Sequence, residues 1–388
     1  MIMLMVARAI FFVFQLGFVL LREIYLILLD HLLHPRKILK HIVVSLAIKH
    51  SISSISSLIW STPSHSFSHE KVDKGSVYNS QEDFRENYKQ MENLKIYAYP
   101  MDNDQYNVTS LEGYFSQHMR SSSFITSDPN SADLFFVPPS MDWDDMMTKY
   151  PYWMPTWGTD HFHVICQDGE LEVPLPILKH YAIRLSCSPV QFNPTRDVLL
   201  PHSSLPYRWP HWKSDIEDKK LLGFWAGNKS SRLGEKLVDM WGADKDLYIR
   251  GLDAHTSYGA LDFWDKLHNS KFCICPAEHF GVSVARITEA IYFGCVPVIF
   301  ANEYELPFNN ILDWSKFSVI LKEECEFHEL KHILKSKGKV EFELLYYNLL
   351  KVQKHFRWNT PPIEEDAFHM VVYELWLRSQ ALKKWRNK

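Results

Sequence analysis

The chain has 388 residues, of which 46% are hydrophobic and 23% charged, a globular composition long enough for two domains. Its formal net charge of −4 excludes the basic surface of a nucleic-acid-binding protein, so no nucleic acid is expected as a partner. Aromatic residues make up 14% of the sequence. Such rings either fill a core or stack on the faces of sugars, which makes carbohydrate a candidate ligand.

Two apolar segments near the N-terminus compete as a membrane anchor, residues 1–33 and residues 42–60. A helix needs about 20 apolar residues to span a bilayer, and both segments approach or exceed that length. The basic residues of 36–40 lie between them. As a cytoplasmic flank of the second segment they would place the rest of the chain in a lumen, whereas after the first segment they would leave it in the cytosol. We expect a single-pass anchor within residues 1–60.

Residues 61–92 are polar and lack a core pattern, so we expect a stem there. Two glycosylation sequons follow, at Asn107 and Asn228, and they favour a lumenal location only weakly because short sequons arise by chance.

The six cysteines show no zinc-type pair of C-x-x-C motifs, so a zinc site is not expected. Cys166 and Cys187 could pair in an oxidising lumen, and the sequence leaves that open. Cys273, Cys275 and Cys295 lie in apolar, strand-like runs and are expected to be small core residues.

Strand-like and helical patterns then alternate along the chain. In the first half, strands are predicted at 94–100, 132–139 and 160–166, with a helix at 110–120. After a charged, Pro-containing break, the second half has predicted strands at 221–227, near Tyr248, and at 271–275, 296–300 and 317–321, with helices at 232–241, 257–270 and 284–293. This alternation predicts two doubly wound α/β domains. We place the domains at 93–215 and 216–360, followed by a helical C-terminal segment, 361–388.

In doubly wound sheets ligands bind beyond the carboxyl ends of the strands, where three loops of the second half would converge. These loops are 226–232, 276–283 and 301–308. In the first loop, Gly227 lets the backbone approach a phosphate and Arg232 supplies a positive charge.

The second loop leads into a helix with Ser283 as its predicted N-cap and with Arg286 and Glu289 at i and i+3. A surface ion pair is one interpretation of these two charges. However, the helix dipole disfavours a cation in the first turn unless an anion lies there. We therefore favour a diphosphate beside Arg286 and ribose hydroxyls beside Glu289, as in nucleotide-binding sheets.

The second half resembles the plant exostosin-like glycosyltransferases, glycosyltransferase family 47, in the segments KFCICP, ARITEAIYFGCVPVIF, YELPFNNILDWSKFSV, VQKHFRWN and DAFHMVVYELWLR. The first half is similar to the same family in KIYAYP, FITSDPNSADLFFVPPS, YPYWMPTWGTDHFHVIC and RDVLLP. The resemblance runs from about residue 94 to residue 380.

The family implies a GT-B fold, in which two Rossmann-like domains face each other across a cleft. It also implies a Golgi type II membrane protein with a lumenal catalytic part, and inverting transfer of a sugar from a nucleotide sugar, taken here as UDP-linked, to a cell-wall matrix polysaccharide. Residues 93–215 would be the acceptor side, and 361–388 would pack back on it. No metal cofactor is expected, because the second half has no D-x-D motif at a strand end and its arginines can meet the phosphate charge.

Three pairs of residues match family elements. Gly227 and Arg232 match its phosphate-side loop, and Arg286 and Glu289 match its R-x-x-E element. Asp160 and His161 match its G-A-D-H-F element, here G-T-D-H-F, and either could be the general base that deprotonates the acceptor hydroxyl. The alternative for Asp160 and His161 is a structural pair at the start of a strand.

The sequence departs from the family pattern at two places. The family's C-P-S-G is replaced by CPAEHFG, which alters the loop at 276–282, and its C-H-D-W is replaced by CQDGE. These departures leave a second hypothesis open. In it, the protein is a catalytically weak or inactive member that serves as a partner subunit of another Golgi glycosyltransferase.

Overall fold

The computed structural model describes residues 76–100, 110–139, 141, 143–166, 181–189, 192–202, 215–229, 231–252, 261–278, 281–282, 284–300, 305–321 and 328–386. All of them belong to the second of two compact units, which begins at Lys74. Both candidate anchor segments and the sequon at Asn107 lie outside the described residues. Within the described part of the chain, no helix combines the length and the apolar character needed to cross a membrane.

The first described helix, α3 (Gln81–Met91), falls inside the predicted stem and shows that the stem prediction was wrong from residue 77 onward. Ser80 caps the helix by accepting a hydrogen bond from the Asp83 amide. Phe84, Tyr88 and Met91 recur at i, i+4 and i+7 and are buried in the main core. The stem therefore ends before the residue Val77, which is itself buried.

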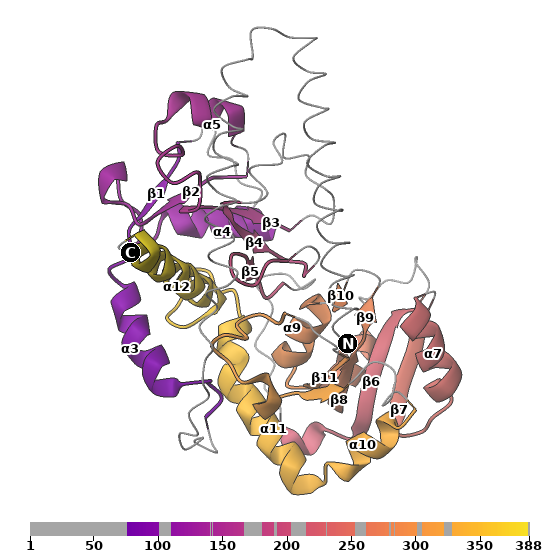
Figure 1. Ribbon diagram of the computed structural model, residues 1–388. Coiled ribbons are helices and arrows are strands. Elements are labelled where there is room, and N and C mark those ends of the chain that lie inside the picture. The colour runs from indigo at the N-terminus through magenta and orange to yellow at the C-terminus, as the bar shows by residue number, and fades with distance from the viewer. Residues whose placement is uncertain are drawn as a thin grey trace, which may run out of the picture. The chain divides into compact units, whose positions relative to one another are not determined.

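The first half contains a five-stranded parallel sheet in the order β1-β2-β3-β4-β5. Its strands are β1 (Ile96–Ala98), β2 (Leu134–Phe136), β3 (His161–Ile165), β4 (Ile183–Ser186) and β5 (Val198–Leu199). Helix α4 (Leu111–Arg120) follows β1, and α5 (Trp143–Lys149) follows β2 (Figure 1). The strand order is sequential, so the described strands of this sheet contain no point where the order reverses.

The second half contains another parallel sheet, in the order β12-β11-β8-β6-β7. Its strands are β6 (Leu221–Asn228), β7 (Leu247–Leu252), β8 (Ser270–Cys275), β11 (Val296–Phe300) and β12 (Val319–Leu321). Renumbered within the half, this is the doubly wound order 2-1-3-4-5, which reverses between β6 and β8. The expected pair of parallel α/β sheets is therefore confirmed, but among the described strands only the second sheet has the predicted doubly wound order, and the sequential order of the first sheet corrects that prediction.

Helices cover both faces of the second sheet. Helix α8 (Leu261–His268) lies on one face, where Phe263 contacts Phe224 of β6 edge-on at 5.2 Å between ring centroids. Helix α11 (Lys339–Val352) lies on the other, where Phe342 meets Phe272 of β8 at 5.4 Å. Two further helices complete the layers, α7 (Arg232–Trp241) after β6 and α9 (Val284–Tyr292) after β8.

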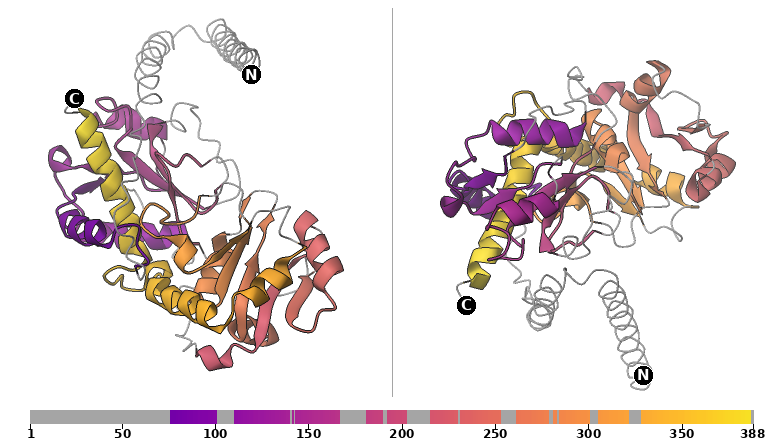
Figure 2. Two further views of the ribbon diagram at one scale, coloured as in Figure 1. Left: turned by 60° about the horizontal axis from the view of Figure 1, so that its bottom comes forward. Right: turned by 90° about the horizontal axis from the view of Figure 1, so that it is seen from above.

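The C-terminal helix α12 (Ala367–Arg386) runs along the first half in both views of Figure 2, and it packs against α3 and β5. Arg378 of α12 donates a 2.8 Å hydrogen bond to the Arg196 carbonyl beside β5. Just before this helix, the Trp358 indole donates to the Pro201 carbonyl at 2.8 Å. The last part of the chain thus returns to the first half after the second half is complete.

Candidate active site

The order reversal between β6 and β8 marks the edge of the second sheet where a ligand is expected. At this edge β8 ends at Cys275 and leads into a two-stranded antiparallel hairpin, β9 (Ala277–Glu278) and β10 (Gly281–Val282), after which α9 begins. Ser283 and loop 301–304 lie outside the described residues, and of Arg232 only the backbone is described, as the first residue of α7. The described candidates at this edge are Gly227, Arg286 and Glu289.

The structure gives one reason for a glycine at position 227 that the sequence did not indicate. A Cβ atom on Gly227 would lie 2.8 Å from Cζ2 of Trp225, two residues earlier on the same face of β6. The glycine therefore makes room for the indole, and its contact with a phosphate remains a prediction. Gly234, which the sequence analysis missed, is more constrained, because a Cβ there would lie 2.1 Å from the Asn228 carbonyl oxygen and would open the β6–α7 turn.

Arg286 and Glu289 form an ion pair on α9, with 2.9 Å between Arg286 Nη1 and Glu289 Oε2. Only 2% of the Glu289 side chain is exposed, against 24% for Arg286. The pair is thus not the surface pair of the simplest interpretation, since surface pairs leave both partners in water. Nor is Glu289 open to a ribose in this conformation. Arg286 alone keeps an exposed edge with which it can contact an anion.

Two residues of other elements lie near this ion pair. The Arg286 guanidinium lies 5.6 Å from the centroid of the Phe263 ring of α8, a cation–π distance. The buried Cys275 thiol lies close enough to feel both charges: burial raises its pKa to about 12, Arg286 opposes that shift and Glu289 adds to it. Phe263 gave no sequence signal of this role, because its contact with Arg286 depends on how α8 and α9 pack.

A disulfide joins Cys273 of β8 to Cys295, just before β11. All three cysteines of these runs are buried in the core as expected, but the bond between Cys273 and Cys295 was not predicted, and Cys275 is free. The two bonded cysteines are 22 positions apart in the sequence, and the bond encloses the segment that contains the hairpin and α9. A cross-link of that span stabilises the folded state by about 3 kcal/mol in the loop-entropy description. It fixes both ends of the segment that carries Arg286.

The second disulfide joins Cys166 after β3 to Cys187 after β4. This is the pairing that the sequence left open. Because the two cysteines follow neighbouring parallel strands, the bond ties together the carboxyl edge of the first sheet.

Asp160 and His161 lie inside the first half, with exposures of 3% and 0%. His161 Nδ1 is 2.8 Å from Asp160 Oδ1, and His161 Nε2 is 2.8 Å from the Tyr99 hydroxyl. Asp160 Oδ1 also accepts a 2.5 Å hydrogen bond from the Thr156 hydroxyl. Burial lowers the pKa of His161, so the neutral ring donates to Asp160 and accepts from Tyr99.

This chain of hydrogen bonds is surrounded by aromatic rings, with Phe135 and Trp153 both 4.8 Å from the His161 ring. A general base has to reach the hydroxyl from which it takes a proton. Because both ring nitrogens of His161 are engaged and neither residue is exposed, the structure favours the structural alternative for this pair.

Asn228 is exposed and directly follows Gly227 at the carboxyl end of β6. Its carbonyl accepts a 2.9 Å hydrogen bond from the Ser231 hydroxyl, which in turn caps α7 by accepting from the Gly234 amide at 3.0 Å. A glycan on Asn228 would occupy the space where the sheet is expected to bind its ligand. Glycosylation of Asn228 and nucleotide binding at this loop are therefore competing predictions.

Comparison with known proteins identifies the chain. The Exostosin GT47 domain matches residues 77–337. A probable glycosyltransferase of Arabidopsis thaliana is 31% identical over 357 residues, which cover 80% of this chain and 67% of that protein. These matches show that the protein is a glycosyltransferase, and its structure has two parallel-sheet α/β domains. It belongs to the exostosin GT47 family.

More distant relatives carry more specific names. A probable glucuronoxylan glucuronosyltransferase of Arabidopsis thaliana is 25% identical over 64% of this chain and 66% of its own length. A probable arabinosyltransferase of the same plant is 24% identical over 61% of this chain and 60% of its own. Among solved structures, an α1,3-fucosyltransferase aligns with 73% of this chain and 91% of its own at 12% identity, with a TM-score of 0.33 that is too low to carry an argument.

The ion pair on α9 predicts a specific pattern in a double-mutant cycle. If Glu289 acts by fixing Arg286, Arg286→Gln weakens UDP binding about ten- to a hundredfold, because charge-assisted contacts contribute about 1.5–3 kcal/mol. Glu289→Gln alone gives a smaller loss, and in the Arg286→Gln background it changes nothing further. Isothermal titration of the four proteins measures this. Glu341→Gln, which removes an exposed pair partner on α11, is the matched control and should bind normally.

If the losses of UDP binding in the two single variants add fully in the double variant, Glu289 does not act through Arg286. It then contacts the nucleotide directly. Arg286→Gln should also lower stability, because it leaves a buried carboxylate without its cation, and the double variant should recover part of that loss.

The hydrogen-bond chain through Asp160 makes a second prediction. Asp160→Asn removes the negative charge from the group that accepts from Thr156 and His161, which weakens both hydrogen bonds. It should reduce the free energy of unfolding by about 1–3 kcal/mol, while kcat stays within about tenfold. Thermal unfolding and a transfer assay on the same protein separate the two effects. A drop in kcat of more than about a hundredfold at unchanged stability would instead identify Asp160 and His161 as the base.

Proposed function

We propose that the protein is an inverting glycosyltransferase that moves a sugar from a UDP-linked donor to a cell-wall matrix polysaccharide in the Golgi lumen. The donor binds at the carboxyl edge of the second sheet, and the acceptor binds to the first half. The reaction needs no metal cofactor, because arginine and the helix N-terminus meet the diphosphate charge.

The half-exposed Arg286 carries this proposal. It stands in the first turn of α9, beside the strand-order reversal of a doubly wound sheet, and the Glu289 carboxylate with which it pairs is buried. A guanidinium in that place offers several N–H donors to a diphosphate in a fixed planar arrangement. The Glu289 carboxylate offsets the unfavourable interaction of this cation with the helix dipole, and a bound diphosphate would offset it further.

The acceptor class rests on the relatives. Their names refer to glucuronoxylan and arabinosyl transfer, which are reactions on plant polysaccharides. The family match extends over most of both halves, so acceptor-side elements are included in it. A matrix polysaccharide is therefore the acceptor class that we assign.

The two disulfides support a lumenal location. Disulfides form and persist in oxidising compartments and are rare in the cytosol. One bond follows the carboxyl ends of β3 and β4, and the other joins β8 to the residue just before β11. This supports the topology in which residues 42–60 are the anchor and the basic residues of 36–40 are its cytoplasmic flank.

One observation favours the alternative, a catalytically weak partner subunit in a hetero-oligomer. The altered segment 276–282 forms the β9–β10 hairpin directly ahead of α9, where an open phosphate loop would otherwise be expected. A hairpin in that position could restrict access to Arg286. Nucleotide binding distinguishes the two hypotheses, because a partner subunit has no need of it.

Nucleotide binding is the first test of this function. UDP at a hundred times its dissociation constant should stabilise the protein by about 2.7 kcal/mol and raise its melting temperature more than GDP does. The increase, and transfer activity with the matching UDP-sugar, should persist in EDTA. Absence of any nucleotide effect would favour the partner-subunit alternative, and an effect lost in EDTA but restored by manganese would contradict the metal-independent site.

The membrane topology can be tested through the two sequons. In intact Golgi vesicles the globular part should be protected from added protease, and glycosidase should increase its mobility in gel electrophoresis. Because a glycan on Asn228 would compete with the donor, Asn107→Gln should abolish the mobility shift and Asn228→Gln should leave it. A protease-accessible, unglycosylated protein would show that the C-terminal bulk faces the cytosol.

A further inference from the structure

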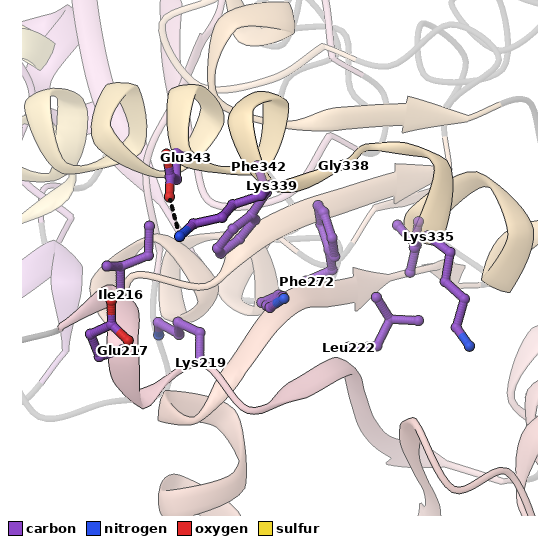
Figure 3. A pocket seen from close by; sticks show the side chains of 12 residues that line it. Ile216, Glu217, Lys219, Leu222, Phe272, Lys335, Gly338, Lys339, Phe342 and Glu343 are labelled. Atoms are coloured by element: carbon purple, nitrogen blue, oxygen red, sulfur yellow. Dashed lines mark ion pairs between the residues drawn. The ribbon is translucent and has the colours of Figure 1, made fainter.

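A pocket of about 450 Å³ lies at the opposite edge of the second sheet, where β6 and β8 begin. Its walls are the short helix η3 (Ile216–Asp218), the first residues of these two strands, and the turn between α10 (Leu330–Ser336) and α11 (Figure 3). Leu222 lines the pocket, and Asn228 ends the same strand at the expected donor site. Six residues of extended chain place the two sites about 20 Å apart.

The pocket combines an apolar floor with a charged rim. Phe272, Phe342 and Leu334 are nearly fully buried and form part of the lining. The charged lining residues are Lys219, Lys271, Lys335, Lys339, Glu217 and Glu343. A neutral apolar ligand does not suit this concave site. It would remove water from four cations and two carboxylates without offering them polar partners, which is costly.

The lysines are engaged to different degrees. The Lys219 ammonium turns inward and donates to the carbonyls of Phe293, at 3.0 Å, and His268. Lys335 pairs with Asp246 at 2.8 Å, outside the pocket lining. In contrast, Lys271 lies over the Phe342 ring at 5.4 Å, and none of the described carboxylates forms an ion pair with it.

Lys339 completes the set of available cations. Its ammonium lies 3.7 Å from Glu343 Oε1, a loose and largely exposed pair. In Figure 3 the Lys339 side chain reaches from α11 across the pocket toward the side on which Glu217 lies, while Lys335 points away at the other end. Lys271 and Lys339 are therefore the cations that an anionic ligand can use.

The two glutamates decide which anion fits. A sulfate carries only acceptors at neutral pH and a phosphate carries at most two O–H donors, so Glu217 and Glu343 would repel either anion with little hydrogen bonding to offset the repulsion. A sugar carboxylate differs, because its ring hydroxyls can donate hydrogen bonds to those carboxylates while its own carboxylate pairs with the lysines. The volume falls in the range of small-molecule sites and is sufficient for a sugar residue.

We propose that this pocket is a second carbohydrate site that binds a uronic acid residue of a polysaccharide chain, with Lys271 and Lys339 on the carboxylate and Glu217 and Glu343 on the hydroxyls. The assignment of the ligand to the polysaccharide acceptor rests on the proposed function. A long acidic chain held at this edge stays attached to the enzyme while its growing part reaches the donor side.

The test uses the full-length protein in detergent and a trisaccharide of galacturonic acid as the probe. Titration calorimetry should show binding that weakens as salt increases, because exposed charges are screened. Lys271→Gln and Lys339→Gln should each weaken it by about tenfold, the loss of one charge-assisted contact. Lys351→Gln, an exposed lysine farther along α11, is the matched control and should bind within about twofold of the unchanged protein.

Three outcomes would overturn the proposal. They are equal binding of a neutral galactose trisaccharide, unchanged binding in both pocket variants, and displacement of the probe by inorganic phosphate or by an acidic peptide at the same concentration. The last result would reassign the pocket to a simple anion or to a protein segment. Lys339 is largely exposed, so its variant should stay folded even if Lys271→Gln is unstable.

Nucleotide binding is measured on the same samples. If UDP fails to bind while the acidic trisaccharide binds as described, the donor assignment fails and the pocket stands. If UDP binds normally but the trisaccharide does not bind, only the pocket assignment fails.

Discussion

A carboxylate that is almost fully buried needs a cation beside it, and in the second half this requirement fixes the candidate site. Ile287 and Ile291 of α9 are completely buried, so the rotation of the helix about its axis is set by the core. That rotation turns Glu289 inward to 2% exposure. Leaving such a charge uncompensated would be costly, and Arg286 lies one turn closer to the helix N-terminus, where it can reach the carboxylate. The guanidinium is consequently held at the edge of the sheet.

Other contacts make that position rigid. The Cys273–Cys295 disulfide closes the segment that contains α9, and Phe263 of α8 lies against the guanidinium. Catalysis that depends on electrostatic stabilisation benefits from charges that are oriented before the substrate arrives. A pocket lies at the opposite edge of the same sheet, so in our proposal the two ends of the sheet hold the donor and a charged part of the acceptor chain.

Much of the fold could be predicted because it is encoded locally. The period of Val284, Ile287 and Ile291, followed by the apolar run at 296–300, predicts a helix and a buried strand, and both are present. The alternation of such units predicts two parallel sheets. Helix α3 was missed because polar residues dominate its composition, although Phe84, Tyr88 and Met91 already have helical spacing.

The details of the sites were less predictable, because they depend on which side chains meet across the fold. Adjacent residues such as Asp160 and His161 give no indication of whether a strand start is exposed, and here aromatic rings from β2 and the α5–β3 connection enclose them. In β8, Cys273 and Cys275 have the same spacing as any two residues on one face of a strand. Only the neighbouring strand determines that Cys273, and not Cys275, meets Cys295.

A crystal structure of the complex with UDP tests the central claim most directly. The account predicts the diphosphate at the carboxyl ends of β6 and β8, with its oxygens within hydrogen-bond distance of the Arg286 guanidinium and with the Arg286–Glu289 pair still formed. A nucleotide bound elsewhere, or one seated at this edge without contact to Arg286, would contradict it.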